Sequence, residues 1–455
     1  MITQKYGDLE LAFTMKQSEW GRTWTGTDKL TASFRLPFSD GWWALTMTPY
    51  TDAYIRDDGG VAVHYQGGLL ARVPSGSDLL KPPVKFEVLG TFQGEGAGFK
   101  QVYLRPVPPP GYRALGDVFC SEGGEKGLLT KIACVKETYN NHPYVRRGEV
   151  AEKALLDNVW AVVNPSYPLD DEDLHMYVPT GAFTYAPNGR PAPNDVSYVL
   201  DVPSVVEKGP DPAIPHLDSY DQPPAQTKIA TDRIVTVPYF MVQDKDRDAA
   251  WKVENSPFYK VMRKRYFSLA LYRDNREGST VAPESKMIES GVTKEQSEAF
   301  SQATGIQVGV SVGVEASAEP FGLGVKATAT ASVNMSLETG YERRYSVTTL
   351  QTVTYTHGLD VAPKHSGALW SETHTLVPIR HDGTDLGSNG HLSFDTVLYY
   401  TDQYPAPVGG DTPRVEYYES ADDGRRLPED QWVGVPYAAP GTPAPDTESD
   451  EQDAH

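Results

Sequence analysis

Cysteine is almost absent from this sequence of 455 residues, which contains only Cys120 and Cys134. Two thiols are too few for a disulfide scaffold or for a cysteine-based metal site. We expect both to be small buried apolar residues, although a single disulfide between them stays an open alternative. The fold must then be held together by burial of apolar side chains and by sheet pairing.

Long hydrophobic runs and targeting signals are also missing. No window reaches the roughly 18 apolar residues that a membrane-spanning helix needs. The first residues, MITQKYGDLELAF, lack the basic start and the apolar stretch of a secretory signal peptide. We therefore expect a chain that is synthesised as a soluble protein and is released from the producing cell by an unknown route.

Motifs of the common enzyme classes are missing as well. The sequence contains no GxSxG, HExxH, P-loop or Rossmann fingerprint. The glycine-rich stretch at residues 94–98 lacks the strand-to-helix setting in which backbone N–H groups cradle a phosphate. The sequence therefore predicts no catalytic residue, no metal ion and no cofactor.

Five of the ten histidines gather in the C-terminal part of the chain, without the i, i+4 spacing of a helical zinc pair. They are His357, His365, His374, His381 and His391. We expect most of them to be exposed strand or loop residues. The alternative is that some of them sense acid pH, because histidine titrates near pH 6 when unperturbed.

Positive charge is scarce, since 61 acidic residues face 41 basic ones and the formal net charge is −20. A surface of this sign argues against nucleic acid as a partner, because phosphate binding needs a basic surface. The same negative charge argues against anionic lipid as a first contact. Any contact with a membrane must then use a specific receptor, which can be a glycan, a lipid headgroup or a protein.

Turn-forming and aromatic residues, by contrast, are abundant: 40 Gly, 36 Pro and 26 Tyr. Uninterrupted helical periodicity is rare, so the composition favours many short strands joined by turns. The length suffices for two or three domains. We predict a mainly β protein.

The most regular pattern lies in residues 305–338, which we call the alternating segment. In its first half the even positions are apolar, and after a short turn the odd positions are apolar. The apolar positions are Ile306, Val308, Val310, Val312, Val314, Ala316, Ala318, Val325, Ala327, Ala329, Ala331, Val333, Met335 and Leu337. The pattern predicts a hairpin with one apolar face, in which Ala318 lies opposite Val325. A slip by one residue would break every apolar pair, so we expect this register.

The length of the two predicted strands sets them apart, because soluble strands usually have about five or six residues. A tilted membrane-spanning strand needs about 9 to 11 residues, and both halves are long enough. A lone hairpin cannot sit in lipid with unpaired edges. Several copies closing into a homo-oligomeric β-barrel pore would satisfy those edges. The alternative is a long curved strand pair within a soluble antiparallel sheet.

In the pore interpretation each part of the alternating segment has a role. The apolar face contacts lipid, and Phe321 and Leu323 form an apolar tip that crosses the bilayer first. The polar face lines the lumen, where the ionisable residues are Glu315, Glu319, Lys326 and Glu338.

A weak internal repeat organises the first two hundred residues. Residues 33–37 and 102–106 each end in proline and are followed by a Gly-aromatic-x-Ala-Leu stretch, at 41–45 and 111–115. A fainter third copy is found at residues 174–185. Three copies predict a pseudo-threefold, β-prism-like domain over residues 1–205, in which three small sheets bury a shared core.

The second copy carries a more specific motif, LRPVPPPGYRALGD at residues 104–117. It resembles the W-R-P-x-P-P-P-G-Y-x-A-L-G-D motif of the vacuolar protein sorting-associated protein 62 family, with Leu104 in place of Trp. The resemblance extends over about residues 5–200 and implies a receptor-binding role for this domain. We expect the motif to shape a turn, with a ligand pocket as the alternative. Its residues are Arg105, Pro106, Pro110, Gly111, Tyr112, Gly116 and Asp117.

A Pro- and Asp-rich stretch at residues 206–230 reads as a linker. After it, residues 231–425 contain long strand patterns rich in Ser, Thr and Tyr around the alternating segment. This arrangement resembles the aerolysin-type β-pore-forming toxins, which implies an elongated antiparallel domain that stows its insertion hairpin against a long sheet. The joined modules look like those of insecticidal-toxin-like proteins.

Two further stretches invite simple interpretations. The alternating acids Asp244, Asp246 and Asp248 lack the glycine and terminal glutamate of a calcium loop, so a solvated helix start is favoured. Residues 426–455 are acidic and poor in apolar side chains, and we expect a disordered tail.

If a pore forms, it should prefer cations. Three carboxylates and one lysine per protomer lie on the polar face, and rings of carboxylates lower the energy of a permeating cation. The preference should be modest at physiological salt, which screens charges within roughly 8 to 10 Å, and should strengthen in dilute salt, where screening acts over longer distances. Reversal potentials of reconstituted channels in a salt gradient measure this for the parent, Glu315→Gln and Lys326→Gln. Anion selectivity in the parent would mean that the lumen face is assigned wrongly.

Overall fold

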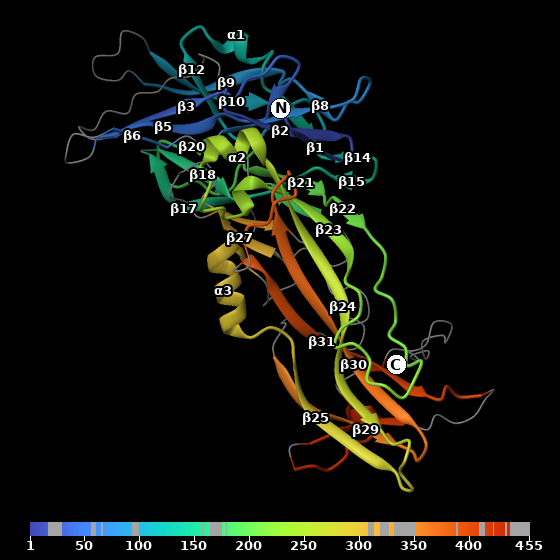
Figure 1. Cartoon of the computed structure of the whole chain (residues 1–455). Helices are drawn as coiled ribbons and strands as arrows, with labels where there is room; N and C mark the ends of the chain where they lie inside the picture. The colour runs from blue at the N-terminus through green and yellow to red at the C-terminus, as the bar shows by residue number, and fades with distance from the viewer. Residues whose placement is uncertain are drawn as a thin grey trace, which may run out of the picture.

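The structure is a computed structural model, and its described parts are mainly β. The described residues are 1–16, 30–55, 61–64, 67–92, 100–156, 158–163, 175–178, 180–307, 314–318, 327–331, 352–387, 390–408, 415–421, 423–432 and 435–436. Their strands pair antiparallel, apart from one short parallel pair between β31 and β33. Figure 1 shows small sheets at one end of the molecule and long strands running away from them.

Three small antiparallel sheets follow one another along the N-terminal part, residues 1–205, each with three strands. The first comprises β3 (Leu30–Arg35), β5 (Thr48–Ile55) and β6 (Val61–His64); the second β9 (Lys85–Phe92), β10 (Gln101–Val107) and β12 (Val118–Ser121); the third β17 (Glu149–Leu156), β18 (Val159–Val163) and β20 (Phe183–Tyr185). Each sheet draws on a separate stretch of the chain. A prism-like arrangement of these sheets stays a prediction.

Other short strands of this part form two further sheets and one strand pair. They are β1 (Thr3–Tyr6), β2 (Leu9–Thr14), β7 (Gly68–Arg72) and β4 (Trp43–Ala44) in one sheet; β8 (Leu80–Lys81), β13 (Cys134–Lys136) and β11 (Tyr112–Arg113) in another; and the pair β14 (Thr138–Tyr139) and β15 (His142–Pro143). The single-turn helix α1 (Glu125–Leu128) follows β12. Cys120 and Cys134 are buried and not joined to each other, so the disulfide alternative does not hold in this structure.

The proline motif of the N-terminal part contains an ion pair between the half-buried Arg105 and the buried Asp117. Arg105 on β10 donates from Nε and Nη2 to the two carboxylate oxygens of Asp117, at 2.8 and 2.9 Å. The Asp117 side chain is 1% exposed and also accepts from the backbone N–H of Tyr185 on β20, at 2.8 Å. A bidentate pair of this kind combines directional geometry with charge. It ties the second small sheet to the third.

The turn within the same motif uses backbone conformations that suit glycine. Gly111 and Gly116 have φ values of +79° and +86°. Between them Tyr112 is buried, and its hydroxyl donates to the backbone carbonyl of Asp78. Pro106 lies within β10 and is buried, whereas Pro110 is exposed just before the turn.

A long twisted sheet forms the C-terminal part, and we call it the long sheet. Its order is β22 (Val206–Lys208), β23 (Ala230–Pro238), β24 (Phe258–Asp274), β30 (Ser366–Ile379), β31 (Leu392–Tyr404) and β33 (Val435–Pro436). β24 has 17 residues, which corresponds to about 55 Å at the rise of a strand. Burial alternates along most of β24, as expected for a sheet with one covered face.

A second sheet lies at the far end of the long sheet (Figure 1). It comprises β25 (Ala282–Ser290), β29 (Val353–Val361) and β32 (Val415–Ser420). The remaining helical elements are η1 (Tyr239–Met241), α2 (Ala249–Asn255), α3 (Lys294–Thr304) and η4 (Glu429–Gln431). No helix in the described ranges has both the length and the apolar character needed to cross a membrane.

Two of the three clustered aspartates before α2 have defined hydrogen-bond partners. Asp248 is the N-cap residue and accepts from the backbone N–H of Trp251, at 2.8 Å. Asp244 is not solvated, because it is buried in an ion pair with Arg380 at 2.7 Å and accepts from the Tyr259 hydroxyl at 2.9 Å. The expected solvated helix start therefore holds for Asp248 and is wrong for Asp244.

One apolar core joins the N-terminal part to the upper end of the long sheet. The ring of Phe13 on β2 lies 5.5 Å from that of Phe258 on β24 and 5.0 Å from that of Tyr239. The same cluster contains Val202 from the N-terminal part and Val261 from β24. Burial of such side chains stabilises by about 1.5–3 kcal/mol each, so the two parts are packed together.

Residues 206–230, predicted as a linker, lie against the long sheet. β22 pairs with β23, and the backbone N–H of Thr227 donates to the carbonyl of Phe267 at 2.9 Å. Further along, the N–H of Leu217 donates to the Asp402 carboxylate at 2.8 Å. This segment therefore contributes backbone hydrogen bonds to the sheet along its length.

The two glycines of the motif provide a matched test of these contacts. A Cβ at Gly116 would lie 2.9 Å from backbone atoms of Phe183, whereas a Cβ at Gly111 would meet nothing within 4 Å. Gly111→Ala should cost about 1–2 kcal/mol of unfolding free energy for its left-handed backbone. Gly116→Ala should cost a further 1–3 kcal/mol or so from overpacking. Urea unfolding measures both, and equal losses would contradict the contact with Phe183.

Candidate functional site

The alternating segment contributes three short strands to the described structure. They are β26 (Ile306–Gln307), β27 (Val314–Ala318) and β28 (Ala327–Ala331). β26 pairs antiparallel with β27, and β27 pairs antiparallel with β28. β26 and β27 therefore run in opposite directions, although they come from the same half of the alternating segment.

This reversal corrects the predicted first strand. We expected residues 305–318 to form one continuous strand, but Ile306 lies opposite Ala316 in an antiparallel pair. Glycines at positions 309 and 313 allow a chain to turn at little steric cost. Strict alternation cannot distinguish one long strand from two antiparallel ones, because apolar positions still pair with apolar positions.

The predicted register also differs from the structure, by two residues. Ala318 lies opposite Ala327 and not opposite Val325, and Val314 lies opposite Ala331. A shift of one residue would exchange the two faces, but a shift of two keeps every apolar position paired with an apolar position. The prediction considered only the first kind of slip.

The other predicted residues of this segment lie outside the described part of the chain. They are Val308, Val310, Val312, Val325, Val333, Met335 and Leu337 on the apolar face, Phe321 and Leu323 at the tip, and Glu319, Lys326 and Glu338 on the polar face. Glu315 lies on β27, where it pairs with Gln307 and Thr330. The roles assigned to these residues stay predictions.

These three strands extend a sheet of the N-terminal part. The sheet order is β16 (Val145–Arg147), β21 (Tyr198–Pro203), β19 (His175–Val178), β28, β27 and β26. The join is the pairing of Met176 with Ala331. β26–β28 pair with one another and with β19, not with a strand of the long sheet. Ile306 nevertheless lies in the core that also contains Leu376 and Phe394 of the long sheet.

The base of the alternating segment is anchored by α3. This helix begins with a capping box of Thr293 and Gln296 and ends at Gly305, whose φ is +73°. Just before this residue, the carbonyl of Thr304 accepts from the N–H of Gln243 at 2.7 Å. Ile306 is 1% exposed and belongs to the joint core. The segment thus starts from a fixed point beside η1.

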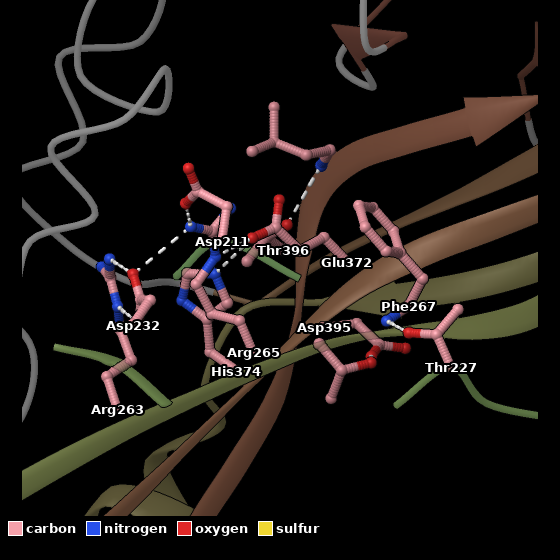
Figure 2. Close-up of polar contacts among 12 residues, drawn as sticks. Asp211, Thr227, Asp232, Arg263, Arg265, Phe267, Glu372, His374, Asp395 and Thr396 are labelled. Carbon is pink, nitrogen blue, oxygen red and sulfur yellow. Dashed lines mark hydrogen bonds and ion pairs between the residues drawn. The ribbon is translucent and has the colours of Figure 1, made fainter. Parts of the chain in front are cut away.

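A second candidate site is a buried ionic network halfway along the long sheet (Figure 2). Its buried residues are Asp232 on β23, Arg263 and Arg265 on β24, and Glu372 and His374 on β30; the exposed Asp211 of the 206–230 segment joins them from the surface. Sequence reasoning missed it. The alternation along β24 could have revealed it. Arg263 and Arg265 occupy the same alternate positions as the apolar Val261 and Phe267, so all four side chains are expected on the buried face of the strand.

Arg265 lies at the centre of the ionic network. It is 3% exposed and contacts Asp211 at 2.7 Å, Asp232 at 3.3 Å and, from Nε, Glu372. Arg263 forms a two-point pair with Asp232, with Nε to Oδ1 at 2.9 Å. Two guanidinium groups therefore share three carboxylates, which compensates the charges that burial removes from water.

The pKa values of the carboxylates follow from these contacts. Burial raises the pKa of Asp232, but the hydrogen bonds and charges of Arg263 and Arg265 outweigh it and lower the pKa below its usual value. Burial likewise raises the pKa of Glu372, yet His374 and Arg265 together lower it to about 2. Both carboxylates are charged at neutral pH. Asp232 on β23 and Glu372 on β30 therefore act as fixed negative charges that bind the arginines of β24 between them.

His374 completes the network and is only 3% exposed. Its Nε2 lies 2.9 Å from Glu372 Oε1, while its Nδ1 has no hydrogen-bond partner among the described residues. Burial lowers the pKa of this imidazole, and the charges of Arg263 and Arg265 act in the same direction against the opposing effect of Glu372. The ring is therefore neutral at pH 7.

The five C-terminal histidines do not share one environment. His357 and His374 are buried, His365 and His391 are intermediate, and His381 is exposed. Burial lowers the pKa of His357 to about 4. The expectation of mostly exposed histidines is wrong for these two, because β29 and β30 turn them towards covered faces of their sheets.

Comparison with known proteins relates the region that holds the alternating segment, and part of the ionic network, to a toxin family. Residues 233–389 match the model of a family described as Insecticidal Crystal Toxin, P42. This span includes β24, α3, the alternating segment and β30. No curated protein matched the chain.

Two solved structures show weaker likenesses. The crystal structure of Cry35Ab1 has 11% sequence identity and a TM-score of 0.34, over 89% of this chain and 91% of that one. The structure of GNIP1Aa from Chromobacterium piscinae has 20% identity and a TM-score of 0.26, over 41% of this chain and 34% of that one. At these TM-scores neither likeness defines the fold. The resemblance of the N-terminal part to the vacuolar protein sorting-associated protein 62 family stays a prediction.

Acid should destabilise the protein through His374. Because the pKa in the folded state lies below the unfolded value near 6.5, the unfolded chain binds the proton first as the pH falls. The stability that the neutral ring contributes is present above about pH 6.5 and is lost below it, with a slope of at most about 1.4 kcal/mol per pH unit. Urea unfolding from pH 7 to 5 should show a smaller slope for His374→Gln than for the parent. The exposed His381→Gln is the control, and an unchanged slope in His374→Gln would contradict this assignment.

Proposed function

We propose that this chain is an insecticidal-type pore-forming toxin. It binds a target cell surface, assembles with further copies of itself and inserts one hairpin per protomer into a transmembrane β-barrel. The observation that carries the proposal is that the match to the insecticidal crystal toxin family falls on the region containing the alternating segment. A toxin family and a membrane-compatible sequence pattern coincide in one stretch of chain.

The alternating segment suits two arrangements of the same residues. In the described structure it contributes three short strands, with β27 between β26 and β28. In a barrel it would form two long strands, in which residues 305–318 become continuous. The apolar positions stay paired with apolar positions in both, because every antiparallel pairing described here preserves parity. The conversion therefore exchanges backbone partners without mixing the two faces.

Oligomerisation follows from the physics of the membrane. A single inserted hairpin would leave two rows of unpaired backbone groups in hydrocarbon, at several kcal/mol for each group. Neighbouring hairpins from other copies would pair those edges and close the barrel. The partner implied for assembly is therefore the chain itself.

The remaining parts of the proposal concern recognition and delivery. The N-terminal part would bind the receptor, which is a glycan, a lipid headgroup or a protein, because a charge of −20 offers no bulk attraction to anionic membranes. No catalytic step and no nucleic acid are involved. The toxin would be made as a soluble protein and act at the membrane of the target cell.

A second candidate function has one observation in its favour. Because β28 pairs with β19, the described strands of the alternating segment are part of the protein's body. A soluble carbohydrate- or lipid-binding protein would show the same arrangement without ever inserting. Dye release from liposomes and from susceptible cells separates the two candidates, since a binding protein leaves membranes intact.

Adjacent residues on β28 provide a sharper test. Ala329→Lys puts a charge on the face assigned to lipid, which costs about 2 to 4 kcal/mol per protomer at the middle of a barrel wall. Thr330→Lys puts the same charge on the face assigned to the lumen. We expect the first variant to lose dye release and the second to retain most of it.

Binding to cells and the unfolding midpoint serve as controls, because both variants must still fold and reach the membrane. Equal release by the two lysine variants would mean that β28 does not face lipid. If neither the parent nor Thr330→Lys releases dye from any liposome or cell to which it binds, the result would favour the binding-protein alternative.

A further inference from the structure

The alternating segment is held by the edge of a strand in the N-terminal part. Without β28, the strands β16, β21 and β19 would form a three-stranded sheet in which β19 is an edge. An edge strand exposes unpaired N–H and C=O groups, which readily pair with another strand. β28 occupies this edge, through the pairing of Met176 with Ala331.

The pairing is matched in polarity across four strands. Val202 pairs with Met176, Met176 with Ala331, and Ala331 with Val314. Val202 and Met176 are 0% and 1% exposed and belong to the core that joins the N-terminal part to the long sheet. The apolar positions of the alternating segment are therefore in register with core positions of the N-terminal sheet.

Insertion cannot proceed while this row is intact. In the barrel proposed above, both edges of the hairpin pair with hairpins of other copies, so β28 cannot also pair with β19. Ile306 and Ala316 belong to the same long strand in that barrel, so their present antiparallel pairing must also break. Both changes start from the fixed point at Gly305, where α3 ends.

We propose that the edge of β19 is a latch, in which the N-terminal part itself keeps the alternating segment from inserting. This inference rests on the proposed function and adds its regulation. Binding of a receptor to the N-terminal part can release the segment, because a shift of β19 would disrupt its pairing with β28. Release of the segment also exposes the β19 edge, which then needs a new partner strand.

A reversible cross-link tests the latch. Directly opposed residues of an antiparallel pair have Cα atoms about 4.5 or 5.5 Å apart, within the range of a disulfide. In the double variant Met176→Cys with Ala331→Cys, oxidised glutathione should form a bridge that joins β19 to β28. The native Cys120 and Cys134 are buried and unpaired, and each single-cysteine variant controls for them.

The matched control is the double variant Arg147→Cys with Tyr198→Cys. These two residues are an opposed pair in the same sheet, on β16 and β21, and both strands stay in the N-terminal part. We expect the oxidised latch variant to bind cells but to lose dye release, and reduction with dithiothreitol to restore it. The control variant should release dye equally in both redox states.

Each other outcome has a definite meaning. Failure of the latch cysteines to cross-link, seen as free thiols by mass spectrometry, would overturn the pairing of β19 with β28. A cross-linked protein that releases dye as well as its reduced form would overturn the latch and leave the pore intact. Absence of release from the parent and from every reduced variant would instead overturn the proposed function, and the latch with it.

Discussion

Every β-sheet edge presents backbone N–H and C=O groups that need partners, and the organisation of this protein depends on how the edge of β19 is filled. β28 fills it, so a strand from the C-terminal part completes a sheet of the N-terminal part. The core around Phe13 and Phe258 packs the same two parts together. A change in the N-terminal part is therefore structurally connected to the alternating segment.

Alternation with a period of two allows one segment to have two structures. Parity is kept when the pairing shifts by two residues or when a strand folds back on itself, and the described strands show both. What changes between the arrangements is strand length and partner. The run of alternate apolar residues is compatible with both the short strands and longer ones.

The ionic network serves a different purpose from the apolar core. A buried ion pair is poor evidence for stability, because desolvation offsets much of the attraction between the charges. Removing one partner is costly, however, since it leaves a charge buried without compensation. Arg265 has partners on three separate segments, at Asp211, Asp232 and Glu372. The network therefore holds β23, β24 and β30 in one register and ties the 206–230 segment to them.

The sequence alone determined the mainly β class and the presence of long strand patterns in residues 231–425. It also determined the parity of the alternating segment, because turn residues and period-two patterns are local properties that short stretches of chain express directly. The Arg105–Asp117 pair shows the limit of such reasoning. The motif predicted a shaped turn, but the link from Asp117 to Tyr185 needed two distant stretches to be placed side by side.

Only the tertiary structure decided which strands meet. The alternating pattern is equally compatible with registers that differ by two residues, and in the structure Ala318 pairs with Ala327 rather than with Val325. No local pattern states that Met176 pairs with Ala331, or that Arg263 and Arg265 contact carboxylates from three segments. Those pairings depend on the packing of the whole chain. A strand edge or a buried charge needs a partner, and the fold of the surrounding core determines which partner lies close enough.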